Sequence, residues 1–520
     1  MMVYEADERP VIPQFYEGKD IFITGVTGFL GKVVVERLLS TCPGVGRIYV
    51  LMRGKRGVDP DARLLHIKKS PAFDILRKKA PEQLDKLCIV VGDIAEPMFG
   101  LNNETIEQLK DVRVVLHCAA TVKLDGPLAN ALTVNTAPVE RLLALTDRMP
   151  HLEVAVHVST LFCQAERPRV EERVYPASRP LADVLHDSKE LSPEDTMKYI
   201  WPKVNTYTFA KDLAESLVAQ RGENAPYATA IFRPAIIVSS SRHPFPGWVE
   251  NFNGPSGVVA GTMSGVLCTL ECDEAELADL MPVDITADAL LAATWETATN
   301  RVPRTRVYNC GGGRRRSWRT LREHIEDGCR ANPAPTALRY PRLILIPHRW
   351  QYLLLAFFYQ TIPLYLLEFI SRIFIRTKKR LDYIIVNRKL YQMNQALRYF
   401  STHRFTFLDD NVRALWVRLS KADKDLYNLD IDNIDWDENH RNFILGVRRH
   451  VMKLSDDTIP AARKHLERVY YIQTVVSVIL PLGLLWLLLK TGALFGAFAL
   501  LSHSVTSVTH CLVDAVAETK

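Results

Sequence analysis

The amino-terminal part of the chain alternates short apolar runs with amphipathic stretches. The apolar runs are rich in Val, Ile and aromatic residues and are typical of strands: Asp20–Thr24, Arg47–Met52, Cys88–Val91, Val112–His117, Ala155–Ser159, Ala228–Phe232 and Thr305–Tyr308. Between them, segments such as Leu30–Ser40 and Leu128–Arg148 repeat apolar residues at helical spacing. Strands that alternate with helices indicate βαβ units, so we predict an α/β domain with a doubly wound parallel sheet over residues 15–340.

The pattern changes after Pro341. Residues Trp350–Leu367 carry no charged side chain and are rich in Leu, Tyr and Phe. A cluster of cations follows, made of Arg372, Arg376, Lys378, Lys379 and Arg380. Because a membrane span takes about 20 apolar residues and this short segment contains Pro363, an interfacial segment and a buried helical hairpin both stay open.

The next stretch, residues 385–460, is polar and helical in pattern. Its aromatic residues, such as Trp416 and Phe443, are expected in a core. We therefore predict a smaller helical domain over residues 345–460.

The carboxy-terminal region is the most apolar part of the chain. Ile472–Leu489 is uncharged and long enough to predict a transmembrane helix. A second uncharged run, Thr491–Val513, contains Ser502 and His503 among other polar residues, so it could be a hairpin partner or lie in the interface. We predict a membrane anchor of one or two helices over residues 470–513. The amino terminus carries acids and prolines where a secretory signal would be apolar.

Composition narrows the classes of partner. The net charge of +6 over 520 residues includes no long basic tract, which argues against a nucleic-acid surface. Nine cysteines are scattered along the chain, as in a protein with reduced thiols. Cys268 and Cys272 are the one close pair, and without a second pair nearby we expect no metal site.

The first predicted strand runs into a glycine-rich turn that opens a helix. Its residues are Thr24, Gly25, Val26, Thr27, Gly28, Phe29, Leu30 and Gly31. Glycine at every third position allows a tight turn, close approach of a pyrophosphate and close packing of helix on strand. The helix amino terminus also favours negative charge. We predict a dinucleotide site at this turn, and a purely structural turn is the alternative.

The second strand ends at Arg53, where a protein that binds NAD would normally offer a carboxylate to the ribose. Arg53, with Lys55 and Arg56 after it, suits a 2′-phosphate, which favours NADPH over an ordinary basic loop. Asp93 follows the third strand and is placed near the adenine. Ala119 and Ala120 follow the fourth strand and are small enough to lie against the cofactor.

Tyr207 and Lys211 are four residues apart, so on a helix they project from one face. A tyrosine can protonate an alkoxide as hydride arrives, provided a cation lowers its pKa, and Lys211 would supply that cation. A hydroxyl near the substrate carbonyl is expected from Ser159 or Thr160, and the sequence does not decide between them. Cys163 lies nearby and is expected to be a buried thiol.

Together these motifs resemble the extended short-chain dehydrogenase/reductase superfamily, and more closely the fatty acyl-CoA reductases. The similar segments are TGVTGFLG, HCAATVKLD, VNT, HVST and YTFAK, with later landmarks at Phe232–Pro234, Met281–Asp284 and Val307–Cys310. The resemblance covers residues 15–460. Two segments depart from the family pattern, Leu161–Gln164 and the loop Gly257–Gly261, and they put the substrate detail in doubt.

The resemblance implies a Rossmann fold and a reductase that converts long-chain acyl-CoA, through an aldehyde, to a primary alcohol with two NADPH. Gly25, Gly28 and Gly31 match its cofactor loop, and Tyr207 and Lys211 match its catalytic pair. A lipid membrane is the expected partner, and because a span near the carboxy terminus suits insertion into the endoplasmic reticulum, that membrane with a cytosolic catalytic domain is the first expectation. The peroxisomal membrane is the alternative, although Glu518–Lys520 is no peroxisomal address of the serine-lysine-leucine type.

Two rival functions stay open. One is another extended reductase, such as a hydroxysteroid dehydrogenase or a sugar epimerase, and the other is a catalytically silent NADPH-binding scaffold. Acyl-chain preference and oligomeric state are open as well.

Overall fold

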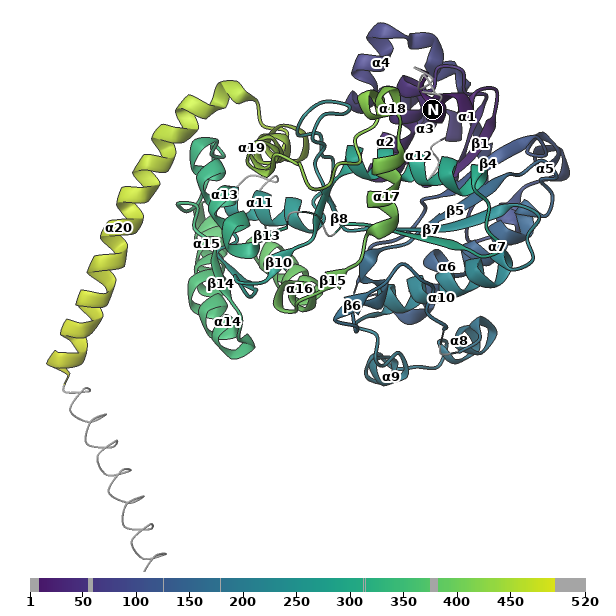
Figure 1. Ribbon diagram of the computed structural model, residues 1–520. Coiled ribbons are helices and arrows are strands. Elements are labelled where there is room, and N and C mark those ends of the chain that lie inside the picture. The colour runs from purple at the N-terminus through teal and green to yellow at the C-terminus, as the bar shows by residue number, and fades with distance from the viewer. Residues whose placement is uncertain are drawn as a thin grey trace, which may run out of the picture.

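The computed structural model has two lobes and a long carboxy-terminal helix that leaves the smaller lobe (Figure 1). It describes residues 9–54, 59–124, 126–177, 179–311, 313, 315–374 and 382–491. The larger lobe holds the parallel sheet and the smaller lobe is mainly helical.

The sheet of the larger lobe has seven parallel strands in the order β12-β7-β5-β4-β1-β2-β3. Their bounds are β1 Asp20–Thr24, β2 Ile48–Met52, β3 Leu87–Val91, β4 Val112–His117, β5 Val154–Val158, β7 Ala228–Pro234 and β12 Arg306–Cys310. All seven predicted strands are confirmed within two residues at either end. Strands β2, β5 and β7 are buried along their whole length, because helices cover both faces of the sheet, and this explains their continuous apolar runs.

One face is covered by α2 (Phe29–Thr41) and α12 (Val283–Thr299), and the other by α6 (Leu128–Asn135), α7 (Ala137–Thr146) and α10 (Thr206–Gly222). The predicted helix Leu128–Arg148 is thus two helices. Pro138 lies in the first turn of α7, where its missing N–H costs nothing, whereas it would interrupt a continuous helix.

The order of the strands creates a crevice beside β1. The chain passes from β1 to β2 on one side and later returns to β4 on the other side. Ligands of such sheets bind at this reversal, outside the carboxyl ends of the strands. Both the glycine-rich turn after β1 and the HCAA segment after β4 lie there.

The smaller lobe has its own apolar core. It is built from α11 (Pro255–Met263), α13 (Trp318–Ala331), α16 (Tyr383–Thr402), α19 (Trp436–Gly446) and the parallel pair β9 (Thr269–Glu271) and β14 (Ile344–Ile346). Phe443 is buried in this core, as predicted. Trp416 is half-buried and packs against the core of the larger lobe instead.

The chain crosses between the lobes more than once. β15 (Thr406–Phe407) pairs with β6 (Arg169–Val170), and α17 (Asp410–Arg418) packs on α12 and β12 of the larger lobe. Residues such as Tyr427 and Ile431 belong to the same core as the sheet. The segment then returns to the smaller lobe at α19.

The remaining elements are short or lie at the periphery. They are α1 Val11–Tyr16, α3 Pro60–Lys68, α4 Asp74–Lys79, α5 Asn103–Gln108, α8 Leu181–Asp187, α9 Pro193–Tyr199, α14 Arg349–Ala356, α15 Ile362–Phe374, α18 Lys421–Leu426, α20 Ile459–Lys490, β8 Ile236–Val238, β10 Leu277–Ala278, β11 Leu280–Pro282 and β13 Arg316–Ser317. A π-helical turn, Phe357–Thr361, joins α14 to α15.

Candidate active site

The glycine-rich turn closely approaches the loop after β4. Gly25 has a φ of +83°, and a Cβ there would lie 2.6 Å from the amide nitrogen of Ala119. A Cβ on Gly31 would lie 2.5 Å from the Gly25 carbonyl oxygen. Gly28 caps α2, so the amino terminus of that helix faces the crevice. The backbone here is shaped as a pyrophosphate cradle requires, so these residues fit a dinucleotide.

The side chains around the turn have different surroundings. Thr27 is exposed, whereas Phe29 and Leu30 are half-buried and pack against the core of the larger lobe. Thr24 is fully buried: its hydroxyl lies 2.7 Å from Nδ1 of His117 and accepts the Ala119 N–H at 3.2 Å. Thr24 therefore fastens β1 to the loop after β4.

A second fastening of this loop involves a residue that sequence reasoning did not identify. Asn135, fully buried in α6, accepts the Thr121 N–H at 2.8 Å and donates to the Thr121 carbonyl at 3.1 Å. This side chain fixes the backbone that follows Ala119 and exposed Ala120. The VNT segment contains this asparagine, but its position in the sequence does not predict whether the side chain is buried or exposed.

Arg53 and Asp93 come together at the ends of β2 and β3. Nη1 of Arg53 lies 3.5 Å from Oδ2 of Asp93, and the arginine side chain is 63% exposed. An ion pair this exposed is weak, so the guanidinium can turn to a phosphate. Lys55 and Arg56 lie outside the described residues.

The smaller lobe reaches over the start of α2. Nζ of Lys32, the residue that follows Gly31, lies 2.5 Å from Oε2 of Glu250. Asp284 holds the strand-end loop that leads there, because its carboxylate accepts the backbone N–H groups of Ser241, Arg242 and His243 at 2.7–2.9 Å. The MPVD landmark thus positions a loop and does not itself face the crevice.

Helix α10 places Tyr207 and Lys211. A capping box starts the helix, since Asn205 accepts the Thr208 N–H at 2.9 Å and the Thr208 hydroxyl is turned back to the Asn205 backbone. Tyr207 therefore lies in the first turn and Lys211 one turn later, and both are buried. Nζ of Lys211 donates to the Val158 carbonyl at 2.8 Å, at the end of β5.

Burial has the largest effect on the pKa of both Tyr207 and Lys211. It lowers the pKa of Lys211 to about 8, although Glu215 acts in the opposite direction. It raises the pKa of Tyr207, with a smaller contribution from Cys163. The structure thus differs from the expectation that Lys211 lowers the pKa of Tyr207: the phenol is neutral and the amine is directed to Val158.

The two candidate hydroxyls after β5 differ in their surroundings. Ser159 is buried, and its hydroxyl lies close enough to Glu215 to help lower the pKa of that carboxyl. Thr160 Oγ1 accepts the Phe162 N–H at 3.3 Å and caps the short helix Leu161–Gln164. An accepted hydrogen bond orients the Thr160 oxygen and leaves its own proton free to be donated.

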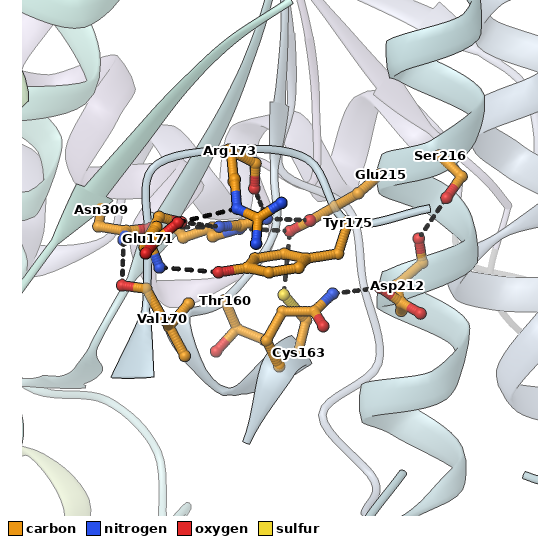
Figure 2. A network of polar contacts seen from close by, with 12 residues as sticks. Thr160, Cys163, Val170, Glu171, Arg173, Tyr175, Asp212, Glu215, Ser216 and Asn309 are labelled. Atoms are coloured by element: carbon orange, nitrogen blue, oxygen red, sulfur yellow. Dashed lines mark hydrogen bonds and ion pairs between the residues drawn. The ribbon is translucent and has the colours of Figure 1, made fainter. Parts of the chain in front are cut away.

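A buried ion pair belongs to a network of polar contacts that includes Glu215, Cys163 and Tyr175 (Figure 2). Arg233 of β7 donates to Glu215 of α10 at 2.5 Å and 2.8 Å, and both side chains are fully buried. Arg233 also donates to the carbonyls of Glu171 and Arg173, and the Cys163 thiol donates to Glu215 at 3.1 Å. The pair therefore joins α10, the sheet and the loop that carries Tyr175.

Arg233 keeps the Glu215 carboxylate of this network charged. Burial alone would raise the pKa of Glu215, but Arg233 holds it below its usual value, so the carboxylate is charged. Burial raises the pKa of Cys163 well above its usual value. Cys163 is thus an uncharged thiol in the protein interior, as expected. A glutamate on a helix resembles a solvent-facing residue in sequence, and Glu215 was missed for that reason.

Two buried histidines lie opposite each other on the neighbouring strands β4 and β5. His117 and His157 stack with ring centroids 5.4 Å apart, and burial followed by the charge of Lys211 lowers the pKa of each. Both are neutral imidazoles. Burial raises the pKa of Cys118, next to His117, and the charge of Lys211 lowers it by a smaller amount. Lys211 thus lies beside the loop that contacts Gly25.

Comparison with known proteins identifies the family of this chain. Two family profiles, both described as "Male sterility protein", match residues 23–290 and 359–454. "Fatty acyl-CoA reductase 1" of Gallus gallus is 36% identical over 91% of this chain and 92% of its own length. The protein of the same name from Homo sapiens is 34% identical, and "Fatty acyl-CoA reductase wat" of Drosophila melanogaster is 35% identical over 93% of this chain and 94% of its own.

Solved structures share the fold at low identity. The reductase domain of a nonribosomal peptide synthetase from Mycobacterium tuberculosis matches with a TM-score of 0.56 at 18% identity, over 87% of this chain and 97% of that domain. The terminal R domain of the myxalamid pathway matches with a TM-score of 0.55 at 18% identity, over 84% and 92%. From its curated relatives, the chain belongs to the fatty acyl-CoA reductase family and is a nicotinamide-dependent oxidoreductase.

Proposed function

We propose that the protein reduces long-chain fatty acyl-CoA to a primary fatty alcohol and CoA, through an aldehyde, with two NADPH. The observation that carries the proposal is the position of Lys211. Its amine lies at the end of β5, beside the loop that packs on Gly25, so the Tyr207–Lys211 pair and the pyrophosphate cradle share one edge of the sheet.

The residues that would hold the cofactor follow from the geometry of the turn. The backbone at Gly25, Gly28 and Gly31 would bind the pyrophosphate, and Ala119 and Ala120 would lie against it. Arg53 would bind a 2′-phosphate, which favours NADPH, and the cofactor when bound supplies the hydride. Asp93 would face the adenine side, because it already lies next to Arg53.

The chain would act on the substrate oxygen. In the first reduction the thioester carbon gains hydride and Tyr207 gives its proton to the oxygen, which yields a hemithioacetal. The carbon–sulfur bond then breaks as the hydroxyl proton passes to the sulfur, so the CoA thiol leaves and the aldehyde remains for the second reduction. In the second reduction the aldehyde carbon gains hydride and Tyr207, reprotonated from solvent, again protonates the oxygen.

We assign the hydroxyl that binds the carbonyl to Thr160. Its oxygen is oriented by the Phe162 N–H and keeps a proton to donate, whereas the Ser159 hydroxyl is enclosed. A positioned donor of this kind stabilises the negative charge that develops on the oxygen.

Membrane attachment would come from residues 470–513, of which α20 covers the part up to Lys490. Ile472, Val475 and Ile479 are among its exposed apolar residues, which suits a helix surrounded by lipid. Residues 492–513 lie outside the described part. We place the protein at the endoplasmic reticulum membrane with its lobes in the cytosol, and the peroxisomal membrane remains the alternative.

One incubation tests the activity. Membranes that contain the protein are supplied with NADPH and palmitoyl-CoA, and the products are separated by gas chromatography. Fatty alcohol supports the proposal. Steroid oxidation in place of alcohol would favour a hydroxysteroid dehydrogenase, and no turnover with NADPH still bound would favour the silent scaffold.

A further inference from the structure

Helices α14 and α15 and the π-helical turn between them expose apolar side chains, whereas a helix on the surface of a protein in water normally exposes polar ones. Their outer face carries exposed large apolar side chains, among them Phe357, Phe358, Leu366, Phe369, Ile373 and Phe374. Among the described residues, Arg349–Phe374 is also the helical stretch that is long and apolar enough to cross a membrane. A contiguous apolar face of this kind marks a surface that something apolar covers.

The face turned toward the protein carries buried polar side chains as well as apolar ones. Gln360, Glu368 and Ser371 are each at most 5% exposed. Gln360 accepts the Cys268 N–H at 3.4 Å, and Glu368 accepts the Tyr383 N–H at 2.9 Å. A helix that contacts lipid turns its polar groups toward the protein and its apolar groups outward, because hydrocarbon offers no hydrogen bonds.

The fold prevents this segment from crossing a bilayer. Tyr352 near its start packs on β14, and Leu364 packs into the core of the smaller lobe. The chain then continues into α16, which packs on α15 and contributes Leu390 to that same core. Both ends are therefore held on one side, whereas a span would separate them by about 30 Å of hydrocarbon.

The charge at the start of the segment suits a headgroup layer. A groove of about 570 Å³ lies between the beginning of α14 and the end of α16, and it is lined by Arg349, Trp350, Arg398 and His403 among others. Its one acid, Glu271, is buried and lies 3.5 Å from Arg349, and Arg398 makes no side-chain hydrogen bond or ion pair within the described chain. Arginine and tryptophan beside an apolar helix are typical of the membrane interface.

We propose that α14 and α15 form a second membrane contact, in which the outer face lies among the acyl chains and the groove binds the phosphates of anionic lipids. This contact extends the membrane attachment proposed above and is independent of the reductase chemistry. Figure 1 shows α14 and α15 at the edge of the smaller lobe far from the sheet, on the same side as α20. One bilayer can thus receive both elements.

The test uses the full chain with an environment-sensitive fluorophore on a single added cysteine, bound to phosphatidylcholine–phosphatidylserine vesicles that carry a quencher in the acyl region. Phe369→Cys reports on α15 and Val478→Cys on α20. Val417→Cys is the matched control, because Val417 is at least as exposed as the two test positions but lies on α17, which packs on the larger lobe. Unsubstituted protein gives the labelling background, and NADPH binding verifies that each variant is folded.

We expect the label at position 369 to shift to the blue and lose most of its emission to the quencher, as at position 478, while the label at 417 does neither. Quenching at 478 with an aqueous signal at 369 would overturn the proposal. A blue shift at 369 without quenching, together with dimers in light scattering, would show that a second copy covers this face and would also overturn it. Replacement of phosphatidylserine by phosphatidylcholine should weaken vesicle binding of the wild type more than that of Arg398→Ala. An equal loss in both would contradict the proposal that the groove binds lipid phosphates.

Discussion

Lys211 donates its buried amine to the carbonyl oxygen of Val158 at 2.8 Å. The contact connects the second turn of α10 to the last residue of β5, immediately before the two candidate hydroxyls. Because a Lys side chain reaches this carbonyl only when the helix is held close to the sheet, the position of Tyr207 one turn earlier is fixed as well. The geometry of the proposed proton donor thus depends on a residue that need not touch the substrate oxygen.

The Tyr207 hydroxyl is the proposed proton donor, and Tyr207→Phe removes only that atom. General acid catalysis contributes about 10²–10⁴-fold, so kcat should fall by that factor with both acyl-CoA and aldehyde. Quenching of tryptophan fluorescence by NADPH should be nearly unchanged, since the ring and its packing remain. A variant that retained more than about a tenth of wild-type turnover would rule out the assignment.

The affinity for NADPH should depend on pH through Lys211. Burial lowers the pKa of this amine to about 8, so it is charged below that pH and neutral above it. An anionic cofactor favours the charged form, and therefore the NADPH dissociation constant should increase as pH rises through about 8. In Lys211→Met, binding should be weaker and this step should be absent in titrations from pH 6 to 10, a range centred on that value. An identical step in the variant would assign it to another group.

Thr160 and Ser159 can be separated by a matched pair of substitutions. Thr160→Val removes the hydroxyl with little change in shape and should lower kcat by about 10²-fold, the lower end of the loss seen when one donor to a developing oxyanion is removed. Ser159→Ala should have a much smaller effect on turnover. Steady-state kinetics with palmitoyl-CoA gives both numbers, and the reverse order would identify Ser159 as the carbonyl-binding group.

Arg53 should select the cofactor. Arg53→Ala is expected to raise the KM for NADPH and to leave the use of NADH nearly unchanged, because only NADPH has the 2′-phosphate. Lys110→Ala, which removes an exposed cation at α5, is the control and should change neither. Unaltered preference between the two cofactors in Arg53→Ala would contradict the assignment.

The pair Glu215–Arg233 should be a requirement for stability. Arg233→Met leaves a buried carboxylate without its partner and should lower the free energy of unfolding by about 3–5 kcal/mol, measured by denaturant titration. The double variant Glu215→Leu/Arg233→Met should recover part of that loss, since no charge remains buried. Lys198→Ala breaks an exposed pair with Asp195 and should leave the unfolding midpoint unchanged. A double variant no more stable than Arg233→Met would argue against an electrostatic cause.

The sheet and the glycine turn were predictable because their signals are local. The apolar run Asp20–Thr24 indicates a buried strand, Gly25 has a positive φ that favours glycine, and Gly28 and Gly31 leave little or no room for a Cβ beside the Gly25 carbonyl. The helix break at Thr136 was missed, although Pro138 marks it, because the apolar spacing continues across the break. The helices on either side still pack on the predicted face.

The rest of the site depends on contacts that spacing cannot encode. Glu215 and Arg233 are 18 residues apart on a helix and a strand, and only the packing of α10 on β7 makes them a pair. For Trp350–Leu367, the sequence shows an apolar segment but not which side of it faces the protein. One face of that segment is buried and the other is exposed, and the contact of the exposed face with a membrane interface stays a prediction.

The repeated passage of the chain between the lobes limits how the molecule can open. A cleft between two domains joined by one linker can widen like a hinge, but here β15, α17 and α18 bind the larger lobe while the segments before and after them belong to the smaller one. Separation of the lobes would pull Phe407 and Tyr427 out of a shared core. Exchange of cofactor and product therefore requires local changes, such as breaking the Lys32–Glu250 ion pair, while the neighbouring Trp248 and Val249 stay buried in the two cores.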